Sequence, residues 1–506
     1  GCSDGNCVPK IVVGPDPAKC ANGGPPIIVP TGGSETECTG SLGAVTFRFG
    51  LCSCTNVGPL GHDLTVDAFD SRVGPYLDQL PNKLGGGIGV NGTIQNTAII
   101  EAFGDFWVFG SAGQVTKGPV RVHDRFFNKN KLDWSAQWFV NEGTLGSCSV
   151  SNTNCFTTGD CPIGGGTCTL TGVVGGEDAW IGGTMIHSGG PSNTGNISGT
   201  LTTGTTACSA MAGLGVTTGA CQAGAFPALA PPCDCDPTKD QLIPVRAIVD
   251  FFSQPANNDN ILIGLSPDAL NGVGGAPRLD LPCGRYYFNQ VNVSGATTIF
   301  VHGRTGIFIG GSVVVSQPII FDLDPDATLD IFVAGVVKTS QDLTLGSPAY
   351  PRLSRMYVGS PGCSGSGTCA VNADCCSGVC QANGVCLGGG GGNISESFSM
   401  SGNSFLNGLM YSGFGTFRVT NPLIMNGAVF TNYYDSVQAL IHFDKGAVQN
   451  GQDECPPPAD NSCEDCRDCD NQACVDNGQG VKQCGACTDD LQCCQPLRCV
   501  SGNCQL

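Results

Sequence analysis

The cysteines constrain this chain more than any other feature of its sequence. There are 32 of them in 506 residues, an even number that allows complete pairing. A protein kept reduced in the cytosol rarely carries so many cysteines unless they bind metal, whereas secreted proteins hold them as disulfides. We therefore expect a secreted protein that works outside the cell or at the cell surface.

The cysteines also fall into clusters, and the long stretches between the clusters are nearly free of cysteine. The clusters lie at 2–54, 148–168, 208–235, 363–386 and 455–504, and Cys283 stands alone. Because the last cluster holds an odd number of cysteines, we expect Cys283 to bridge to it. The pattern predicts a scaffold that is decorated by small cystine-stapled modules.

Between the clusters, short β-branched and aromatic runs are separated by glycine, asparagine or aspartate. From 289 to 337 such runs recur every ~8–12 residues, as in Thr298–Val301 and Ser312–Val315. Helical periodicity is nearly confined to 239–253. The scaffold is too long for one β-sandwich, whereas stacked coils accept any length. The predicted fold is all-β: a right-handed β-helix (solenoid) with small disulfide-rich inserted and C-terminal modules.

The predicted segments follow the cysteine clusters. They are a disulfide-stapled N-terminal segment (1–60), solenoid coils (61–147), a cystine insert (148–170), further coils (171–207), a second cystine insert (208–238), the β-helix core (239–362), a knottin-like insert (363–392), the closing coils (393–450) and a cysteine-rich C-terminal module (451–506).

Three short motifs in the closing coils carry a resemblance to a known family. They are Gly408-Leu-Met-Tyr411, Gly427-Ala-Val-Phe430 and Ile441-His-Phe-Asp444. They resemble the last coils of a bacterial surface β-helix that is often associated with type IV pilus assembly proteins, and 285–335 resembles the coils before them. The resemblance implies a right-handed β-helix at a bacterial surface. No catalytic residues are established for that family, so it implies none here.

Two groups of six cysteines share an order with a vicinal pair at the centre, which is typical of knottin-like modules. Six cysteines allow 15 connectivities, but the repeated order favours a cystine knot in each group. The members are Cys363, Cys369, Cys375, Cys376, Cys380 and Cys386 in the first group, and Cys484, Cys487, Cys493, Cys494, Cys499 and Cys504 in the second.

Two patterns invite a metal-binding interpretation. The spacing of Cys463, Cys466, Cys469 and Cys474 suits zinc or an iron–sulfur cluster, although the acidic neighbours of these cysteines and an extracellular location favour disulfides. Asp322, Asp324, Asp326 and Asp330 offer alternate carboxylates of the kind that calcium accepts, and the alternative is a turn whose carboxylates face water. We expect no cofactor other than possible calcium at these four aspartates.

Charge and hydropathy exclude some partners. The net charge is −19, and no basic stripe interrupts it, so we expect no nucleic-acid ligand. No apolar run is long enough to span a membrane.

Trp107, Trp134, Trp138 and Trp180 fall in one region, where they form either a sugar-stacking platform or the aromatic filling of wide coils.

The open ends of a solenoid indicate a function. Unpaired backbone groups at the two ends must be capped or used, and stacking on another copy uses them. We therefore expect a non-catalytic structural protein that assembles with itself or with other surface components into a filament or matrix. A monomeric adhesin that binds glycan is the alternative. A polysaccharide lyase or hydrolase acting through Asp322 and Asp330 is the least favoured interpretation.

The cysteine count makes a direct prediction. If every cysteine is bridged, alkylation of the native protein without reduction will leave its mass unchanged, and alkylation after reduction will add 32 groups. Intact-mass spectrometry measures both values. Alkylation of many cysteines without reduction would contradict an oxidised, extracellular protein.

Overall fold

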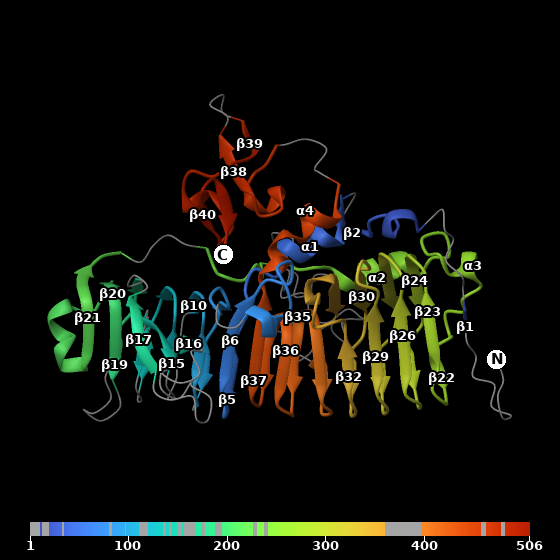
Figure 1. Cartoon of the computed structure of the whole chain (residues 1–506), viewed down its shortest axis with the longest axis horizontal. Coiled ribbons are helices and arrows are strands. Elements are labelled where there is room, and N and C mark those ends of the chain that lie inside the picture. Colours follow the sequence, from blue (N-terminus) through green and yellow to red (C-terminus); the bar gives the residue numbers. More distant parts are fainter. Residues whose placement is uncertain are drawn as a thin grey trace, which may run out of the picture. The chain divides into compact units, whose positions relative to one another are not determined.

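The computed structural model describes residues 11–12, 20–32, 35–79, 83–96, 98–110, 120–134, 138–140, 144–148, 154–155, 168–173, 178–187, 195–225, 230–236, 241–359, 396–456, 462–476 and 481–506. These residues are mostly β and contain a large parallel sheet (Figure 1). The chain forms two compact units: unit 1 comprises Gly1–Arg48, Asp234–Ser436 and Gly446–Leu506, and unit 2 comprises Phe49–Cys233 and Val437–Lys445. The predicted knottin-like insert, Cys363 to Cys386, lies outside the described residues.

In unit 1 the strands form three parallel ladders, because a strand generally pairs with the third strand after it. The first ladder holds β1 (Ile11–Val12), β23 (Arg278–Leu281), β26 (Thr297–Val301), β29 (Ile319–Leu323) and β32 (Leu343–Leu345). The second holds β24 (Gly284–Phe288), β27 (Thr305–Ile309), β30 (Leu329–Val333) and β33 (Ser354–Val358). The third holds β22 (Asn271–Val273), β25 (Val291–Val293), β28 (Val313–Val315), β31 (Val337–Thr339) and β34 (Glu396–Met400). All three continue into the long strands β35 (Ser404–Val419) and β36 (Leu423–Ser436).

The register of these ladders places like residues on like. Ile307 pairs with Ile331, and Ile331 pairs with Met356, and all three side chains are fully buried. The resemblance motifs follow the same rule, because Gly408 pairs with Gly427 and Tyr411 with Phe430. Aliphatic rows of this kind form a continuous core, so each strand adds buried apolar area to its neighbours.

An aromatic row runs along the second ladder. Successive rings stack from Phe252 of helix α2 (Val245–Ser253) onto Phe308, and from Phe308 to Phe332, with centroid distances of 3.8 and 5.3 Å. The row continues from Phe332 to Tyr357 at 4.6 Å, and then through Tyr411 to Phe430. Because α2 packs against β24, β27 and β30, it covers the part of this row that begins at Phe308 and Phe332, whereas Phe430 ends the row at β36.

Unit 2 has the same kind of parallel pairing. One ladder runs β4 (Leu51–Ser53), β7 (Ile88–Val90), β10 (Phe106–Val108), β12 (Phe126–Asn128), β18 (Ala179–Ile181), β20 (Gly195–Thr203) and β21 (Val216–Ala223). Another runs β37 (Ala439–Asp444), β6 (Leu64–Phe69), β9 (Ile100–Ala102), β11 (Val120–Val122), β14 (Trp138–Val140), β20 and β21. Smaller pairings join β5 (Val57–Leu60) to β8 (Ile94–Asn96), β13 (Leu132–Trp134) to β19 (Met185–His187), and β15 (Thr144–Cys148) to β16 (Asn154–Cys155) and β17 (Cys168–Val173).

The remaining elements of unit 1 are short. They are the hairpin β2 (Ile28–Gly32) and β3 (Glu35–Cys38), the helices α1 (Thr39–Thr46), α3 (Asn260–Ile263) and α4 (Asn450–Glu454), the 3-10 helix η10 (Cys466–Cys469), and the hairpins β38 (Ala473–Asp476) with β39 (Lys482–Gly485) and β40 (Arg498–Val500) with β41 (Asn503–Gln505). No helix among the described residues is both long and apolar enough to cross a membrane.

The disulfides connect distant clusters, so the predicted bridge from Cys283 to the C-terminal cluster is wrong. Cys283 pairs with Cys20, and Cys455 pairs with Cys38. The reason is that the N-terminal segment lies along unit 1: the carbonyl of Gly23 accepts a hydrogen bond from the Arg304 amide at 2.7 Å. In unit 2, Cys52 pairs with Cys233 and Cys208 with Cys221. The described residues include no free cysteine.

The C-terminal six-cysteine group is fully oxidised but is not a closed module. Cys487 pairs with Cys499 and Cys493 with Cys504 inside the group. Cys484 and Cys494 instead bridge to Cys469 and Cys466, and Cys463 pairs with Cys474. The predicted self-contained knot is therefore wrong, because the module also includes the residues from Cys463 onward. Hereafter we call 462–506 the C-terminal module.

The aromatic row predicts a large difference between two phenylalanines of unit 1. Phe332 is fully buried in the row, whereas Phe405 is 56% exposed. Phe332→Ala leaves a cavity and should lower the free energy of unfolding by about 3–5 kcal/mol, whereas Phe405→Ala should change it by less than about 0.5 kcal/mol. Thermal or denaturant unfolding monitored by circular dichroism measures both. Equal effects would contradict the packing described.

Candidate binding site

A cleft with a volume of about 820 Å³ lies within unit 1. Its lining comes from β2, β3, α1, the connecting segment 241–244, Phe430 of β36 and the start of the C-terminal module. The apolar lining residues are Ile28, Leu42, Val45, Leu242, Ile243, Pro244, Phe430 and Pro456. The acidic ones are Glu37, Asp234, Glu464, Asp465, Asp468 and Asp470, and Arg467 is the one cationic residue among the described residues of the lining.

Close packing places α1 at the cleft. A Cβ atom on Gly40 would lie 2.9 Å from the Asn450 carbonyl oxygen of α4, and one on Gly43 would lie 2.9 Å from Cδ of Arg355. Glycine is therefore required at both positions for α1 to approach its neighbours. The Cys38–Cys455 disulfide fixes the adjoining ends of α1 and α4, and both cysteines line the cleft.

A buried ion network holds these two helices to the sheet. The Arg355 guanidinium is fully buried and donates to both carboxylate oxygens of Asp330, at 2.6 and 3.1 Å. It also donates to both oxygens of Glu454 in α4, at 3.1 and 2.7 Å. The Thr39 hydroxyl at the start of α1 donates to Asp330 at 2.7 Å. One arginine therefore links β30, β33, α1 and α4.

The network also shifts proton affinities. Burial works against the charged guanidinium, but Asp330 and Glu454 outweigh it and raise the pKa of Arg355 well above its ordinary value. Burial raises the pKa of Glu454, although Arg355 partly opposes this. The arginine is therefore permanently charged, and the folded state favours the protonated form of Glu454 more than the unfolded chain does.

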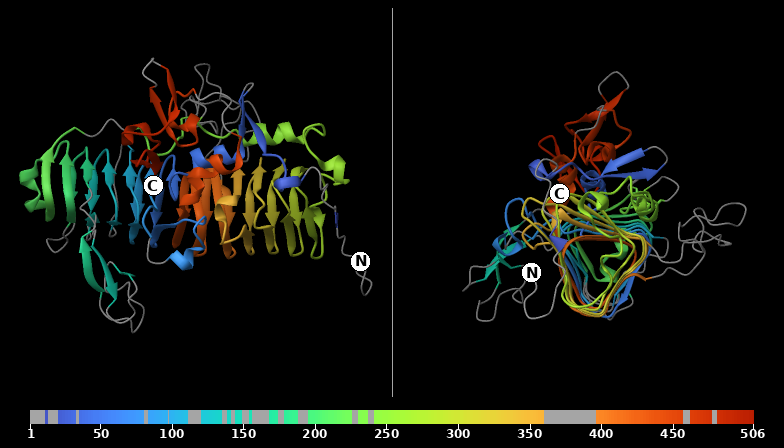
Figure 2. Two further views of the ribbon diagram at one scale, coloured as in Figure 1. Left: turned by 45° about the horizontal axis from the view of Figure 1, so that its top comes forward. Right: turned by 90° about the vertical axis from the view of Figure 1, so that its right-hand side faces the viewer.

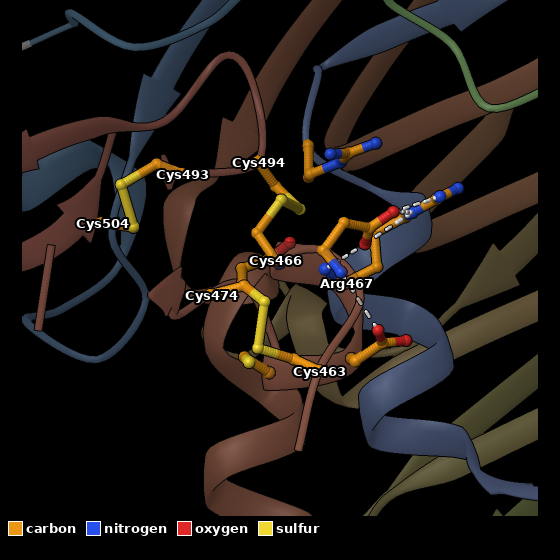
Figure 3. Close-up of a disulfide and its surroundings, with 12 residues drawn as sticks. Cys463, Cys466, Arg467, Cys474, Cys493, Cys494 and Cys504 are labelled. Atoms are coloured by element: carbon orange, nitrogen blue, oxygen red, sulfur yellow. Dashed lines mark hydrogen bonds and ion pairs between the residues drawn. A yellow bond between two sulfur atoms is a disulfide. The ribbon is translucent and has the colours of Figure 1, made fainter. Parts of the chain in front are cut away.

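The acidic residues of the cleft fall into two sets. Arg48 pairs with Asp234, and Arg467 pairs with Asp465 and lies 3.8 Å from Asp234 (Figure 3). The second set, Glu464, Asp468 and Asp470, forms no ion pair with any described residue. Burial raises the pKa of Asp470, partly offset by a hydrogen bond from Ser41. The cleft therefore holds three carboxylates outside any ion pair with a described residue, although the Lys482 ammonium donates to the Glu464 carbonyl at 3.0 Å and the Asp468 carboxylate accepts from the Glu464 and Asp465 amides.

The structure separates the four aspartates predicted as possible calcium ligands. Asp330 is buried in the ion network, and Asp324 binds the His302 ring nitrogen Nδ1 at 2.9 Å. Asp322 accepts from the Leu323 amide, and Asp326 is exposed. Groups of three or more possible ligand atoms within 4.8 Å, among the described residues, contain only disulfide cysteines: Cys463, Cys469 and Cys484, and Cys487, Cys493 and Cys504. Calcium binding at the four aspartates stays a prediction.

The described tryptophans of unit 2 do not form an open platform. Trp107 is only 2% exposed and packs on Phe127, which stacks on Trp180 with ring centroids 4.6 Å apart. The side chains of Trp134 and Trp138 lie outside what the structure describes. Sequence reasoning missed Arg355, Glu454 and the cleft residues. An arginine inside the apolar strand Ser354–Val358 was the one available signal.

Comparison with known proteins adds no identification, because no family model, no curated protein and no solved structure matches this chain.

The ion network predicts a large cost for removing its cation. Arg355→Met leaves Asp330 and Glu454 buried without their cation, and should lower the free energy of unfolding at neutral pH by about 3–5 kcal/mol. Arg418, which pairs on the surface with Glu396 and Asp435, is the control. Arg418→Met should cost at most about 1 kcal/mol.

The pH dependence of the Arg355→Met effect is a second check on the same network. Burial raises the pKa of Glu454, so lowering the pH protonates this stranded carboxylate and the destabilisation should shrink in acid. Denaturant unfolding at several pH values measures the trend. A cost that does not depend on pH would mean that lost packing, not lost charge pairing, dominates.

Proposed function

We propose that this protein is a non-catalytic extracellular binding protein, an adhesin-like molecule whose ligand occupies the cleft of unit 1. The observation that carries the proposal is the cleft itself. Its volume lies in the range of about 300–1,000 Å³ found for ligand sites, and it combines apolar lining with a few converging polar groups. The disulfides support an extracellular location, because such bridges persist in oxidising compartments.

We further propose that the parallel sheet is a right-handed β-helix. Pairing of each strand with the third strand after it supports a three-sided coil, and crossovers between parallel strands are right-handed in about 98% of cases. The yellow and orange strands trace a closed three-sided outline in the end-on view of Figure 2, which supports the same arrangement. The coils would then form the rigid support that carries the cleft and the C-terminal module.

Self-assembly into a filament is the second candidate. It is favoured by β21, which pairs only with β20 among the described strands and so offers an open edge. The backbone edge of β24, by contrast, is already hydrogen-bonded to residues of the preceding segment. The Asn260 side chain donates to the Tyr287 carbonyl at 2.7 Å and accepts from the Tyr287 amide at 2.9 Å. The backbone amide of Asp259 donates to the Arg285 carbonyl at 2.7 Å, and the Asp259 carboxylate accepts from the Arg285 amide at 2.8 Å. An edge whose backbone groups are already hydrogen-bonded cannot pair with a strand of another copy. We therefore rank ligand binding in the cleft above self-assembly.

A tryptophan that fills the cleft tests the proposal. Thr46, half-buried at the end of α1, lines the cleft, and Thr344, half-buried on β32, does not. Labelled wild-type protein, Thr46→Trp and Thr344→Trp would be applied to arrays of glycans and of peptides. We expect Thr46→Trp to abolish binding and Thr344→Trp to retain it, with unchanged melting temperatures.

Two results would contradict binding in the cleft. Retained binding by Thr46→Trp would place the ligand elsewhere. No binding by the wild-type protein, together with regular filaments in electron microscopy, would favour the assembly function.

A further inference from the structure

We infer that the ligand of this cleft is an extended, basic segment of a partner protein, in which lysine or arginine side chains alternate with apolar ones. The inference rests on the proposed function, because it names the chemical class of the ligand at that same site. Charge, apolar lining and the distribution of both over the cleft walls support it.

The first step is charge. Arg48 and Arg467 neutralise Asp234 and Asp465, and these pairs require no ligand. Glu464, Asp468 and Asp470 stand within seven residues of the chain, and their carboxylates form no ion pair with a residue that the structure describes; the nearby Lys482 ammonium is bound to the Glu464 carbonyl instead. Like charges held this close repel one another, so a bound ammonium or guanidinium group lowers their energy. An anionic ligand such as a nucleic acid or an acidic glycan raises the electrostatic energy of these carboxylates.

The second step is the apolar lining. Ile28 remains 39% exposed although it is a large aliphatic side chain, and the half-buried side chains of Val45 and Leu242 also face the cleft. A small polar amine would leave these groups in contact with water. A ligand that carries apolar side chains covers them, and this burial adds to the electrostatic attraction.

The third step is the distribution of the two kinds of lining. The carboxylates without an ion pair belong to the C-terminal module, at 464–470, whereas most of the apolar lining residues belong to β2, α1 and 242–244. Acidic and apolar groups therefore line the cleft from different segments of the chain. Successive side chains of an extended peptide point to opposite sides. A strand with alternating basic and apolar residues can present one kind of side chain to each of these segments.

Three short fluorescein-labelled peptides test this inference by fluorescence anisotropy. One alternates lysine with leucine, one glutamate with leucine, and one lysine with serine. We expect the lysine–leucine peptide to bind best, the lysine–serine peptide to bind weakly for lack of apolar contacts, and the glutamate–leucine peptide not to bind. Binding should weaken as salt is added, because the carboxylates are partly exposed.

A charge-matched pair of variants separates the site from the general acidity of the protein. Glu464→Gln combined with Asp470→Asn removes two uncompensated charges from the cleft and should weaken lysine–leucine binding by about fivefold to tenfold. Asp476→Asn, at an exposed residue of the same module outside the cleft lining, should leave affinity nearly unchanged. Thr46→Trp should abolish binding.

The outcomes distinguish the inference from the proposed function. Equal binding of the lysine–leucine and glutamate–leucine peptides, or equal effects of the cleft and control variants, would overturn the basic-segment inference. If Thr46→Trp still removes binding to a glycan or to an acidic peptide on the arrays, the cleft remains the binding site and only the ligand class is wrong. If Thr46→Trp removes no binding at all, both fail.

Discussion

In-register parallel pairing is the constraint on which the rest of unit 1 depends. Each residue lies beside its equivalent on the neighbouring strand, so a position that is aliphatic in one strand must be compatible with aliphatic neighbours on both sides. The same rule aligns the aromatic row that α2 covers. A charged residue that enters a buried row needs a partner in the adjacent strand. Arg355 meets this requirement, because Asp330 is its register partner in β30.

The ion network connects the repetitive sheet to the non-repetitive parts. A repetitive stack offers many equivalent positions for a docked helix, and apolar contacts alone discriminate poorly between them. Arg355 and Asp330 occupy one position only, and their contacts with Thr39 and Glu454 fix α1 and α4 there. Burying these charges has a desolvation cost, so we assign the network a role in specificity of docking more than in net stability.

The sequence predicts the repeated strands well, but it predicts poorly which distant segments of the chain contact one another. Short β-branched runs with turn residues predicted the β-rich fold, and two of the motifs that carried the resemblance, 408–411 and 427–430, lie in register on the adjacent strands β35 and β36. The partner of Cys283 was mispredicted because the parity of a cluster says nothing about which distant segment folds back onto it. The acidic run at 464–470 was visible in the sequence, but the cleft was not, since its other lining residues come from positions as far away as Glu37 and Asp234. Arg355 and Asp330 were visible as charges within apolar runs, but pairing them requires the register.

The disulfides explain how an uncompensated acidic cleft can persist. Repulsion among Glu464, Asp468 and Asp470 favours separation of these residues, and a module of this size cannot bury enough apolar surface to resist it. Covalent bridges supply the resistance: Cys463–Cys474, Cys466–Cys494 and Cys469–Cys484 hold the acidic segment, and Cys38–Cys455 ties the chain before it to β3 and α1. The repulsion is therefore retained in the folded state instead of being relieved by local unfolding. In the proposed function, a cationic ligand in the cleft lowers this repulsion, and the disulfides hold the carboxylates in place for it.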